Sequence, residues 1–600
     1  MRKNLLAKSI ATLVSGFALV GGAHAVIVAN PSAPANVTPA ITLEVNTDGI
    51  GHSLLYPYYN AQGINYTLFT VTNTDMLNGK AIKIRFRGAE NSDDVYDITV
   101  FLSPGDVWNA NITRGNDGIA KLSTVDKSCT LPNNVNGSFV TNRLSPAQSA
   151  AQKAQSTTEG YIEVFNMADI PPKYAQGAGP VLGGTTNALY TAIKHVNGVP
   201  PGCSESSAVM QALFTDPTDV ITAESLGFGA PTTGLMGEWT ILNGPAAASW
   251  ASPAVAIEAR VGNSDIPGYG NIVFFPQNNT PVAATLVAQA TSDPILRGGT
   301  VDNTLASLGT LAPVQALNFD FPDMSTPYLN SDGSILGNGV ATRRQAYRLS
   351  RALAVSSISN EFVTGSGILA MTDWTLSSPS RRYNVARNYA ANANLYTNLG
   401  FDDANVPVPA VLVPPNATAT TNPTNYYTPR NVAVTTYSGT APQGVICVLG
   451  STVQFTAGLT SPVPNNLITG VNANTEENFV ATGPSGFVIS PGQGPGQPDN
   501  LCGEVSVASF NAPRPALSVL NAQITRFDLS SVNAAGWQRI ATPGLVVAAG
   551  QGLGGSTRNG LPIIGNAFVQ FTNNNALAGG AAAGTIANYD QTFTHRATRY

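Results

Sequence analysis

The chain has 600 residues, of which only 11% are charged, and its formal net charge is −5. Soluble domains average about 25% charged residues, and this composition, rich in Gly, Pro, Asn, Thr, Ser and Ala, is instead typical of short strands joined by many turns. The hydrophobic content of 43% excludes intrinsic disorder, and the acidic balance without a basic stripe argues against a nucleic-acid partner.

The first predicted element is a secretory signal peptide, residues 1–25. A basic start is followed by an apolar stretch at residues 10–20, and Ala23 and Ala25 form a small-x-small cleavage site. The apolar stretch is shorter than the ~20 residues that a membrane-spanning helix needs. We therefore expect cleavage after Ala25, an extracytoplasmic protein, and no transmembrane segment in the mature chain.

A first β domain is predicted over residues 41–300, after a Pro- and Ala-rich extended leader at residues 26–40. In the clearest strand, residues 81–87, apolar side chains alternate with Lys83, Arg85 and Arg87, so the basic side chains are expected on the solvent face of a half-buried strand. Turn signals separate this strand from others of similar length. The spacing predicts an antiparallel, Ig-like β-sandwich, with further strands at residues 66–72, 96–102 and 160–165.

Helices are expected in only three places, at residues 145–157, 204–214 and 342–353. The first has Ser145 as its N-cap and Pro146 at its first helical position. In the third, Arg344, Arg348 and Arg351 share one polar face.

Residues 301–600 are predicted to form a second, β-rich domain that includes the third helix. Long loops at residues 406–430 and 481–500 interrupt it, and loops of this length usually carry function or lie at interfaces. No internal repeat of fixed period is present, which disfavours solenoids and propellers. Strands are expected at residues 367–376, 432–437, 445–455 and 516–527.

Four cysteines are expected to form two disulfides, because an exported protein reaches an oxidising compartment. Three pairings are possible. The local pairs Cys129–Cys203 and Cys447–Cys502 are preferred, since they fall in separate halves of the chain. The lack of a CxxC motif excludes thioredoxin-like, zinc-ribbon and c-type haem sites.

Several sequence blocks resemble a known family. The most specific are LLYPYY at residues 54–59, GKAIKIRF at 79–86 and FLSPGDVW at 101–108, and looser blocks extend over nearly the whole mature chain. They are similar to a family of exported proteobacterial proteins usually labelled only as cell surface proteins. The resemblance implies a Gram-negative source and the same β-rich fold class, and it supports the Cys129–Cys203 pair because both cysteines lie in matching blocks. It implies no catalytic residues.

Few residues are available for catalysis. After signal removal only His52, His195 and His595 remain, far apart in sequence, and each is interpreted as a surface or structural residue. GxSxG and HExxH motifs are absent. The GxGxxG match at residues 550–555 is not followed by a helical sequence, so it is interpreted as a loop. We expect no enzyme, and neither catalytic nor cofactor-binding residues.

Two weaker patterns involve acidic residues. Turns at residues 91–94, 116–118 and 330–333 have oxygen ligands of the kind that a structural calcium ion prefers, but they are more simply β-turns. Glu159 and Glu163 would share one face of a strand, and nothing in the sequence places a glycosidase cleft beside them. No metal ligand is therefore predicted.

The expected function is that of a secreted, non-enzymatic structural protein of the cell surface or extracellular matrix: a surface-layer, sheath or filament component that self-associates through its β-rich domains. Residues 26–44 are a candidate strand for donation to a neighbouring copy. The alternative is a surface adhesin that binds a glycan or surface polysaccharide, with aromatic side chains stacked on the sugar: Tyr56, Tyr58, Tyr59, Tyr426 and Tyr427. For Tyr56, Tyr58 and Tyr59, packing within a strand is the preferred interpretation. A secreted hydrolase would require His52 or His195 to converge with Asp and Ser.

Overall fold

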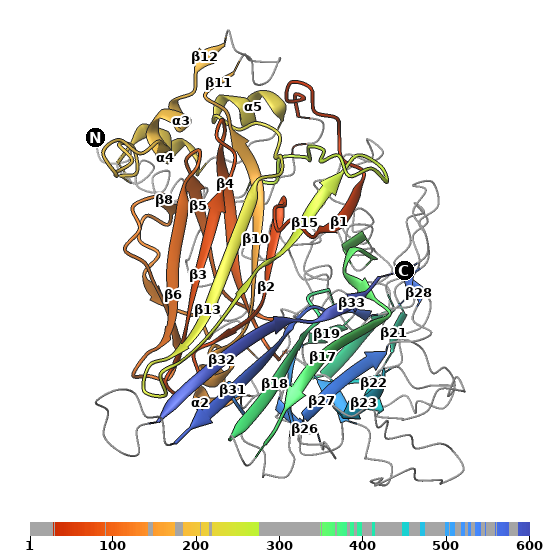
Figure 1. The fold of residues 1–600 in the computed structure, drawn as a ribbon. Coiled ribbons are helices and arrows are strands. Elements are labelled where there is room, and N and C mark those ends of the chain that lie inside the picture. The colour runs from red at the N-terminus through yellow and green to blue at the C-terminus, as the bar shows by residue number, and fades with distance from the viewer. Residues whose placement is uncertain are drawn as a thin grey trace, which may run out of the picture.

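The computed structural model describes Val28, most of residues 31–274, and parts of the chain between residues 348 and 599. It leaves out residues 1–27, 29–30 and 275–347, and several shorter segments. Between residues 381 and 560 it describes mainly the strands and a few short stretches. The described chain is mainly β, built of several antiparallel sheets, as the sequence predicts (Figure 1).

Two sheets form the first sandwich. The seven-stranded sheet has the order β1-β15-β2-β10-β4-β5-β8, with the bounds β1 (Thr42–Asn46), β15 (Val255–Arg260), β2 (Ser53–Asn60), β10 (Glu159–Ile170), β4 (Gly79–Gly88), β5 (Asp94–Leu102) and β8 (Cys129–Leu131). The six-stranded sheet has the order β14-β13-β3-β6-β7-β9, with the bounds β14 (Ala248–Pro253), β13 (Leu235–Asn243), β3 (Asn65–Asn73), β6 (Val107–Arg114), β7 (Ala120–Ser123) and β9 (Gly137–Ser138).

Aromatic side chains join these two sheets. Phe69 of β3 packs edge-on against Phe86 of β4 and Trp108 of β6, with ring centroids 5.7 and 5.6 Å apart. Such edge-to-face pairs add to the stabilisation from apolar burial. The strands predicted at residues 66–72, 81–87, 96–102 and 160–165 are confirmed as β3, β4, β5 and β10.

Two further sheets belong to the second part of the chain. One has the order β24-β22-β23-β27-β17-β33, with the bounds β24 (Asp499–Cys502), β22 (Cys447–Gln454), β23 (Ile468–Asn474), β27 (Ala535–Ala541), β17 (Ser357–Val363) and β33 (Arg596–Thr598). The other has the order β26-β25-β18-β31-β32, with the bounds β26 (Arg526–Leu529), β25 (Val505–Phe510), β18 (Ala370–Ser377), β31 (Asn566–Asn573) and β32 (Ala587–Thr594). Phe362 of β17 stacks on Phe510 of β25, so these two sheets also pack face to face.

The remaining described strands are short. They pair as β11–β12, β16–β30, β19–β20–β21 and β28–β29, with the bounds β11 (Lys173–Tyr174), β12 (Thr185–Thr186), β16 (Ala354–Val355), β30 (Leu561–Pro562), β19 (Val385–Asn388), β20 (Ala393–Asn398), β21 (Val411–Val413), β28 (Val546–Val547) and β29 (Arg558–Asn559). The predictions at residues 367–376 and 445–455 are confirmed as β18 and β22. Residues 432–437 lie outside the described residues.

The strand predicted at residues 516–527 is wrong over residues 518–522, where Val519 and Leu520 lie in a turn. A strand begins at Arg526, and residues 516–517 and 523–525 lie outside the described residues. The turn is held by the buried carboxylate of Asp373, which accepts hydrogen bonds from the Ser518 hydroxyl at 2.5 Å and the Leu520 N–H at 3.0 Å. A tertiary contact has therefore overridden the β propensity of this apolar sequence.

Four short helices have full bounds in the structure: α2 (Ala150–Ser156), α3 (Ala188–Ile193), α4 (Ala208–Ala212) and α5 (Val220–Ser225). The predicted N-cap of the first was wrong. Ser149, not Ser145, caps it, because Ser149 and Gln152 form a capping box that satisfies two backbone N–H groups. The predicted helix at residues 204–214 is only five residues long and begins after Ser207. None of the described helices is long and apolar enough to span a membrane.

The third predicted helix is described at residues 348–349 and 351–353. Its polar face is not exposed: Arg348 and Arg351 are both buried, and Arg351 forms a 3.0 Å ion pair with Glu44 of β1. Arg344 lies outside the described residues. Arg351 thus faces the first sandwich rather than solvent.

The described parts of the two predicted domains share one hydrophobic core. Phe568 of β31 packs against Trp239 of β13 and Tyr58 of β2, with ring centroids 5.9 and 6.4 Å apart. The backbone carbonyl of Leu520 accepts hydrogen bonds from the side chains of Asn60 and Asn65. Figure 1 shows the β31–β32 hairpin, in blue, against the lower end of the first sandwich. The predicted boundary near residue 300 lies outside the described residues.

The predicted leader is paired within its own chain. Val28 bridges to Ile272, and the Ala40 N–H donates to the Tyr269 carbonyl at 2.9 Å. Val28 and Ala40 are also buried. A copy that donates this segment to a neighbour would first have to break these contacts.

Candidate functional site

His195 lies beside both a serine and an aspartate, as a hydrolase would require. Its Nδ1 is 3.1 Å from the Ser103 hydroxyl and 3.5 Å from an oxygen of Asp106. A catalytic triad uses both imidazole nitrogens, Nε2 toward the serine and Nδ1 toward the acid. Here both partners meet the same nitrogen, and Asp106 also accepts from the hydroxyls of Ser103 and Ser128. The cluster therefore fastens a turn and does not form a triad.

His52 is a buried structural residue at the start of β2. Its Nε2–H donates to the Gly268 carbonyl at 2.8 Å, and its Nδ1 accepts from the Ala259 N–H at 3.1 Å. Because burial disfavours the charged imidazolium, the pKa of His52 falls to about 3. A neutral ring with both nitrogens bonded can join these segments but cannot act as a base near neutral pH.

His595 is held in the same way at the junction of β32 and β33. Its Nε2–H donates to the Thr375 carbonyl at 3.0 Å, and its Nδ1 accepts from the Asn360 side chain at 3.1 Å. Burial lowers the pKa of His595 to about 4. The environments of His52, His195 and His595 are all consistent with the interpretation of these histidines as structural residues.

The basic face of β4 is not exposed, and the sequence prediction here was wrong. Lys83, Arg85 and Arg87 are at most 1% exposed. They meet carboxylates from the flanking strands β5 and β10. The pairs are Lys83–Asp97 at 3.2 Å, Arg85–Asp94 at 3.4 Å and Arg87–Glu163 at 3.2 Å. We call these six residues the ionic layer.

Charge balance makes this burial tolerable, since a buried charge is costly unless it is paired and hydrogen-bonded. The ionic layer contains three cations and three carboxylates. Desolvation still lowers the pKa of Lys83 to about 8, against the opposing field of Asp97. The layer is thus an internal ionic contact of the fold and presents no charge to a ligand.

The carboxylates Glu159 and Glu163 do not line a cleft. Both are fully buried, and a register shift between Gly160 and Ile162 lies between them. Glu163 belongs to the ionic layer, whereas Glu159 accepts a 2.7 Å hydrogen bond from Tyr58. The two groups therefore serve separate structural contacts.

A disulfide joins Cys129 of β8 to Cys203 in the segment between α3 and α4, with Cα atoms 4.8 Å apart. It fastens the end of the seven-stranded sheet to a surface segment near His195. The backbones of Cys447 and Cys502 are directly paired across β22 and β24. Their side chains lie outside the described residues, so the second disulfide stays a prediction.

The tyrosines proposed to stack on a glycan are inaccessible. Tyr56, Tyr58 and Tyr59 are fully buried, so this part of the adhesin hypothesis is wrong. Their rings fill the core between the sheets, and Tyr56 donates its hydroxyl hydrogen to the Thr70 carbonyl at 2.5 Å. Tyr426 and Tyr427 lie outside the described residues.

The acidic turns have ordinary turn contacts where they are described. Asp117 accepts from the Ile119 N–H at 3.1 Å, and Gly118 donates to the Gly115 carbonyl at 2.9 Å. Asp94 is a member of the ionic layer. Within the described residues no group of three His, Cys, Asp or Glu side chains could hold a metal ion. Residues 330–333 lie outside the description.

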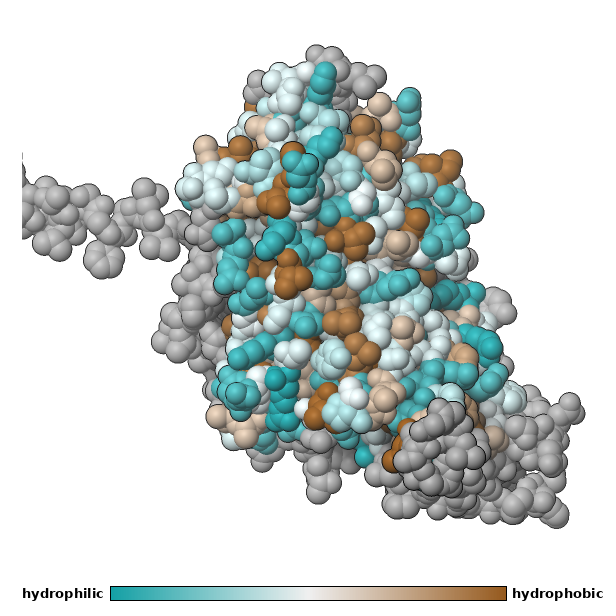
Figure 2. Space-filling view, turned by 60° about the vertical axis from the view of Figure 1, so that its left-hand side comes forward, coloured by the Kyte–Doolittle hydropathy of each residue, from teal (hydrophilic) through white to brown (hydrophobic). Residues whose placement is uncertain are grey.

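Four strands of the six-stranded sheet, β14, β13, β3 and β6, present outward side chains with very little charge. We call these side chains the outer face: Tyr66, Leu68, Thr70, Thr72, Val107, Asn109, Asn111, Thr113, Met236, Glu238, Thr240, Leu242, Ser249, Ala251 and Pro253. Glu238 is its one charged member, and Lys121 of β7, opposite Thr113, borders it. Leu68, Val107 and Met236 are 38%, 46% and 37% exposed. Figure 2, which turns the left side of Figure 1 forward, shows hydrophobic residues, in brown, scattered among residues of intermediate and hydrophilic character.

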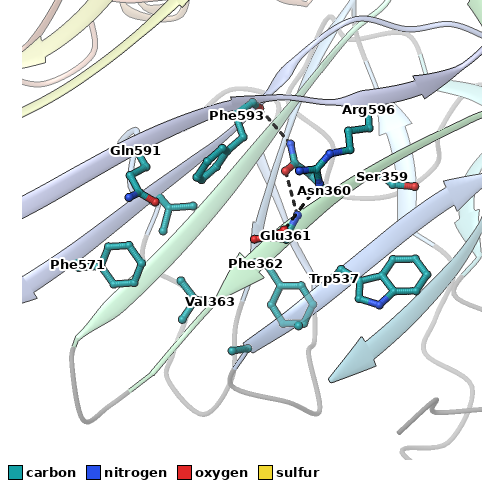
Figure 3. A pocket seen from close by; sticks show the side chains of 13 residues that line it. Ser359, Asn360, Glu361, Phe362, Val363, Trp537, Phe571, Gln591, Phe593 and Arg596 are labelled. Atoms are coloured by element: carbon teal, nitrogen blue, oxygen red, sulfur yellow. Dashed lines mark hydrogen bonds and ion pairs between the residues drawn. The ribbon is translucent and has the colours of Figure 1, made fainter. Parts of the chain in front are cut away.

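A pocket of about 430 Å³ opens in the second part of the chain. Its walls are β17 and β27 on one side and the β31–β32 hairpin on the other (Figure 3). Its lining combines aromatic and polar side chains, among them Glu361, Trp537, Phe571, Gln591, Phe593 and Arg596. Aromatic walls with a few polar groups are typical of small-molecule sites. None of these residues was singled out as a ligand-binding residue from the sequence.

Comparisons with known proteins bring no further constraint. No family model matches the chain, and no curated protein or solved structure matches it either. The family resemblance read from the sequence blocks stays a prediction. Function must therefore be argued from the surfaces and the pocket described above.

Proposed function

We propose that the protein is a secreted, non-enzymatic structural component of the cell surface that self-associates through the outer face. The supporting observation is the composition of this face, which presents Leu68, Val107 and Met236 among residues of which only Glu238 is charged. The Ig-like assignment of the first sandwich belongs to the same proposal, with the support of two antiparallel sheets packed around aromatic side chains.

The strand register explains why these apolar residues form one surface. Thr72 of β3 lies directly opposite Met236 of β13 and Val107 of β6, so these three residues form one row across the sheet. Leu68 lies two rows further along β3, opposite Thr240 and Asn111 in the same pairing. Charged residues are depleted at the centres of protein interfaces, and the outer face has one, Glu238, which lies opposite Thr70 in the row between these two.

Assembly through this face needs no partner of another kind. Two copies of a face with a single carboxylate, that of Glu238, meet with little electrostatic repulsion, and a two-fold contact uses the same patch on both copies. The buried ionic layer and the Cys129–Cys203 disulfide would supply the rigid building block that a surface layer or sheath requires.

Light scattering and electron microscopy of the exported chain test the proposal, with and without calcium. We expect concentration-dependent assemblies that the double variant Leu68→Glu/Met236→Glu reduces to monomers. Val125→Glu is the matched control, because Val125 is 85% exposed in the segment after β7 and lies outside the outer face. Monomers of the unaltered chain under all conditions would refute self-association, and assemblies that survive the double variant would exclude this face.

A further inference from the structure

The β31–β32 hairpin has two faces with different environments. On one face, Phe568 and Asp590 contact the first sandwich: Phe568 packs on Trp239, and Asp590 accepts a 2.8 Å hydrogen bond from the Ser249 N–H. The other face carries Phe571, Gln591 and Phe593, which line the pocket. The first sandwich therefore holds one face of the hairpin in place, and the opposite, aromatic face lines the pocket.

The aromatic surface extends beyond the pocket mouth. Tyr589 lies directly opposite Phe571 across the hairpin, so the two side chains share a face. Tyr589 is 59% exposed and Phe593 is 38% exposed. Trp537 of β27 closes the other side of the pocket and is half-buried. Figure 3 shows Phe571 and Phe593 on one side and Trp537 on the other.

The backbone of β17 along this pocket is not available for pairing with a peptide strand. The Glu361 N–H donates to the Asn360 side chain, and the Glu361 carbonyl accepts from the Trp374 indole. The Thr372 hydroxyl accepts from the Val363 N–H and donates to the Val363 carbonyl. Because side chains already satisfy these groups, strand addition, which depends on free backbone donors and acceptors, is disfavoured here.

The charges in the pocket balance. Glu361 and Arg596 form an ion pair at 3.7 Å, and their side chains are 67% and 73% exposed. Together with the Gln591 amide, they offer both acceptors and donors to a ligand with hydroxyl groups. A ligand of strong charge of either sign would gain from one member of the pair and be repelled by the other.

We propose that this pocket binds a neutral oligosaccharide. The electron-rich faces of Trp537, Phe571 and Phe593 suit the weakly positive C–H faces of a pyranose ring. Glu361, Gln591 and Arg596 then hydrogen-bond its hydroxyl groups at the rim. This binding does not depend on self-association, because the outer face belongs to a different sheet from the pocket walls.

Tryptophan fluorescence gives a direct test. The chain has five tryptophans, and Trp108, Trp239, Trp250 and Trp374 are fully buried. Trp537 is thus the one that aqueous iodide can quench. The probes are the hexasaccharides of cellulose, xylan, mannan, chitin and starch, with oligogalacturonate as the anionic comparison. We expect at least one neutral hexasaccharide to protect Trp537 from iodide at about millimolar concentration, and oligogalacturonate to give no stronger protection.

Variants then separate the pocket from nonspecific effects, with affinity measured by calorimetry. Phe593→Ala and Trp537→Ala are each expected to weaken binding about tenfold, the change that one lost stacking contact produces. Trp537→Phe should retain most of the affinity while removing the iodide-sensitive emission. Phe214→Ala is the matched control, since Phe214 is an exposed aromatic outside the pocket and its loss should leave affinity unchanged.

Three results would overturn the proposal. The first is that none of the neutral hexasaccharides protects Trp537 at about 10 mM, because any affinity would then be too weak for recognition. The second is equal loss of binding in Phe214→Ala and Phe593→Ala. The third is protection by extended peptides but by none of the sugars, which would assign the pocket to a protein partner instead.

Discussion

The indole N–H of Trp250 donates a 3.2 Å hydrogen bond to the backbone carbonyl of Val569, which is 319 residues further along the chain. Trp250 lies in β14, at the edge of the first sandwich, and Val569 lies in β31 of the second part. The indole is fully buried. This contact and the packing of Phe568 on Trp239 bind the β31–β32 hairpin to the first sandwich.

Replacing Trp250 with phenylalanine should destabilise the protein by about 1–3 kcal/mol, because the Val569 carbonyl loses its donor in a buried setting. The free energy of unfolding in urea is the quantity to measure. Trp537→Phe is the control, since Trp537 is only half-buried and should change stability less. If both variants lose the same stability, the Trp250 hydrogen bond contributes nothing specific.

Removal of the Cys129–Cys203 disulfide should cost about 4 kcal/mol, since it closes a long loop in the unfolded chain. The sequence separation of 74 residues sets this magnitude. Urea unfolding of the Cys129→Ser/Cys203→Ser double variant measures it, and the unaltered chain in reductant gives an independent comparison. An unchanged midpoint in the double variant would show that the surrounding contacts hold this segment without the disulfide.

Removing one partner of a pair in the ionic layer should destabilise the protein strongly, whereas replacing both partners with apolar residues should destabilise it only slightly. Asp97→Asn is expected to cost about 3–5 kcal/mol, because it leaves Lys83 buried without its nearby carboxylate charge. The double replacement Lys83→Met/Asp97→Leu should recover most of this loss, since apolar side chains avoid the desolvation cost. Urea unfolding of the two variants provides the comparison.

A surface ion pair is the matched control for the ionic layer. Arg260 and Asp265 are 2.7 Å apart, but the Asp265 side chain is 97% exposed. Exposed pairs contribute little because water and salt screen them, so Asp265→Asn should leave the urea midpoint unchanged. A loss equal to that of Asp97→Asn would mean that burial does not decide the strength of these pairs.

The ionic layer also shows how far the sequence predicts the fold. Alternation of apolar and basic residues correctly located β4, because the two faces of a strand differ at a period of two. The same alternation cannot distinguish a solvated face from a buried one that has charged partners. That information lies in β5 and β10, whose Asp94, Asp97 and Glu163 supply the carboxylates. Pairing these strands requires the tertiary register, which the chain order alone does not give.

The sequence alone does not predict the pocket, for a related reason. Its aromatic residues come from β17, β27, β31 and β32. Trp537 and Phe593 approach one another only after β27 pairs with β17 and β31 pairs with β18, strands far away in the sequence. One local signal did exist: Tyr589, Gln591 and Phe593 alternate along the chain. On a strand, such a set shares one face. The exposure of two large aromatics in that set is what distinguishes a binding surface from a core strand.

Acid should destabilise the protein through its two buried histidines. The pKa values of His52 and His595 fall from 6.5 to about 3 and about 4 in the folded state. Between these values and 6.5 the unfolded chain binds more protons, so stability is fully present above pH 6.5 and is lost as the pH falls below it. Lowering the pH to about 4.5 should reduce the free energy of unfolding by about 2 kcal/mol for each histidine.

Two buried carboxyl groups act in the opposite direction. Burial raises the pKa values of Asp169 and Asp373, so these groups stabilise the folded state as the pH falls. The histidine effect is therefore best isolated by comparing a variant with the unaltered chain. The decrease in the free energy of unfolding between pH 7.5 and 4.5 should be smaller in His52→Gln than in the unaltered chain. Equal decreases would show that His52 does not set the acid sensitivity.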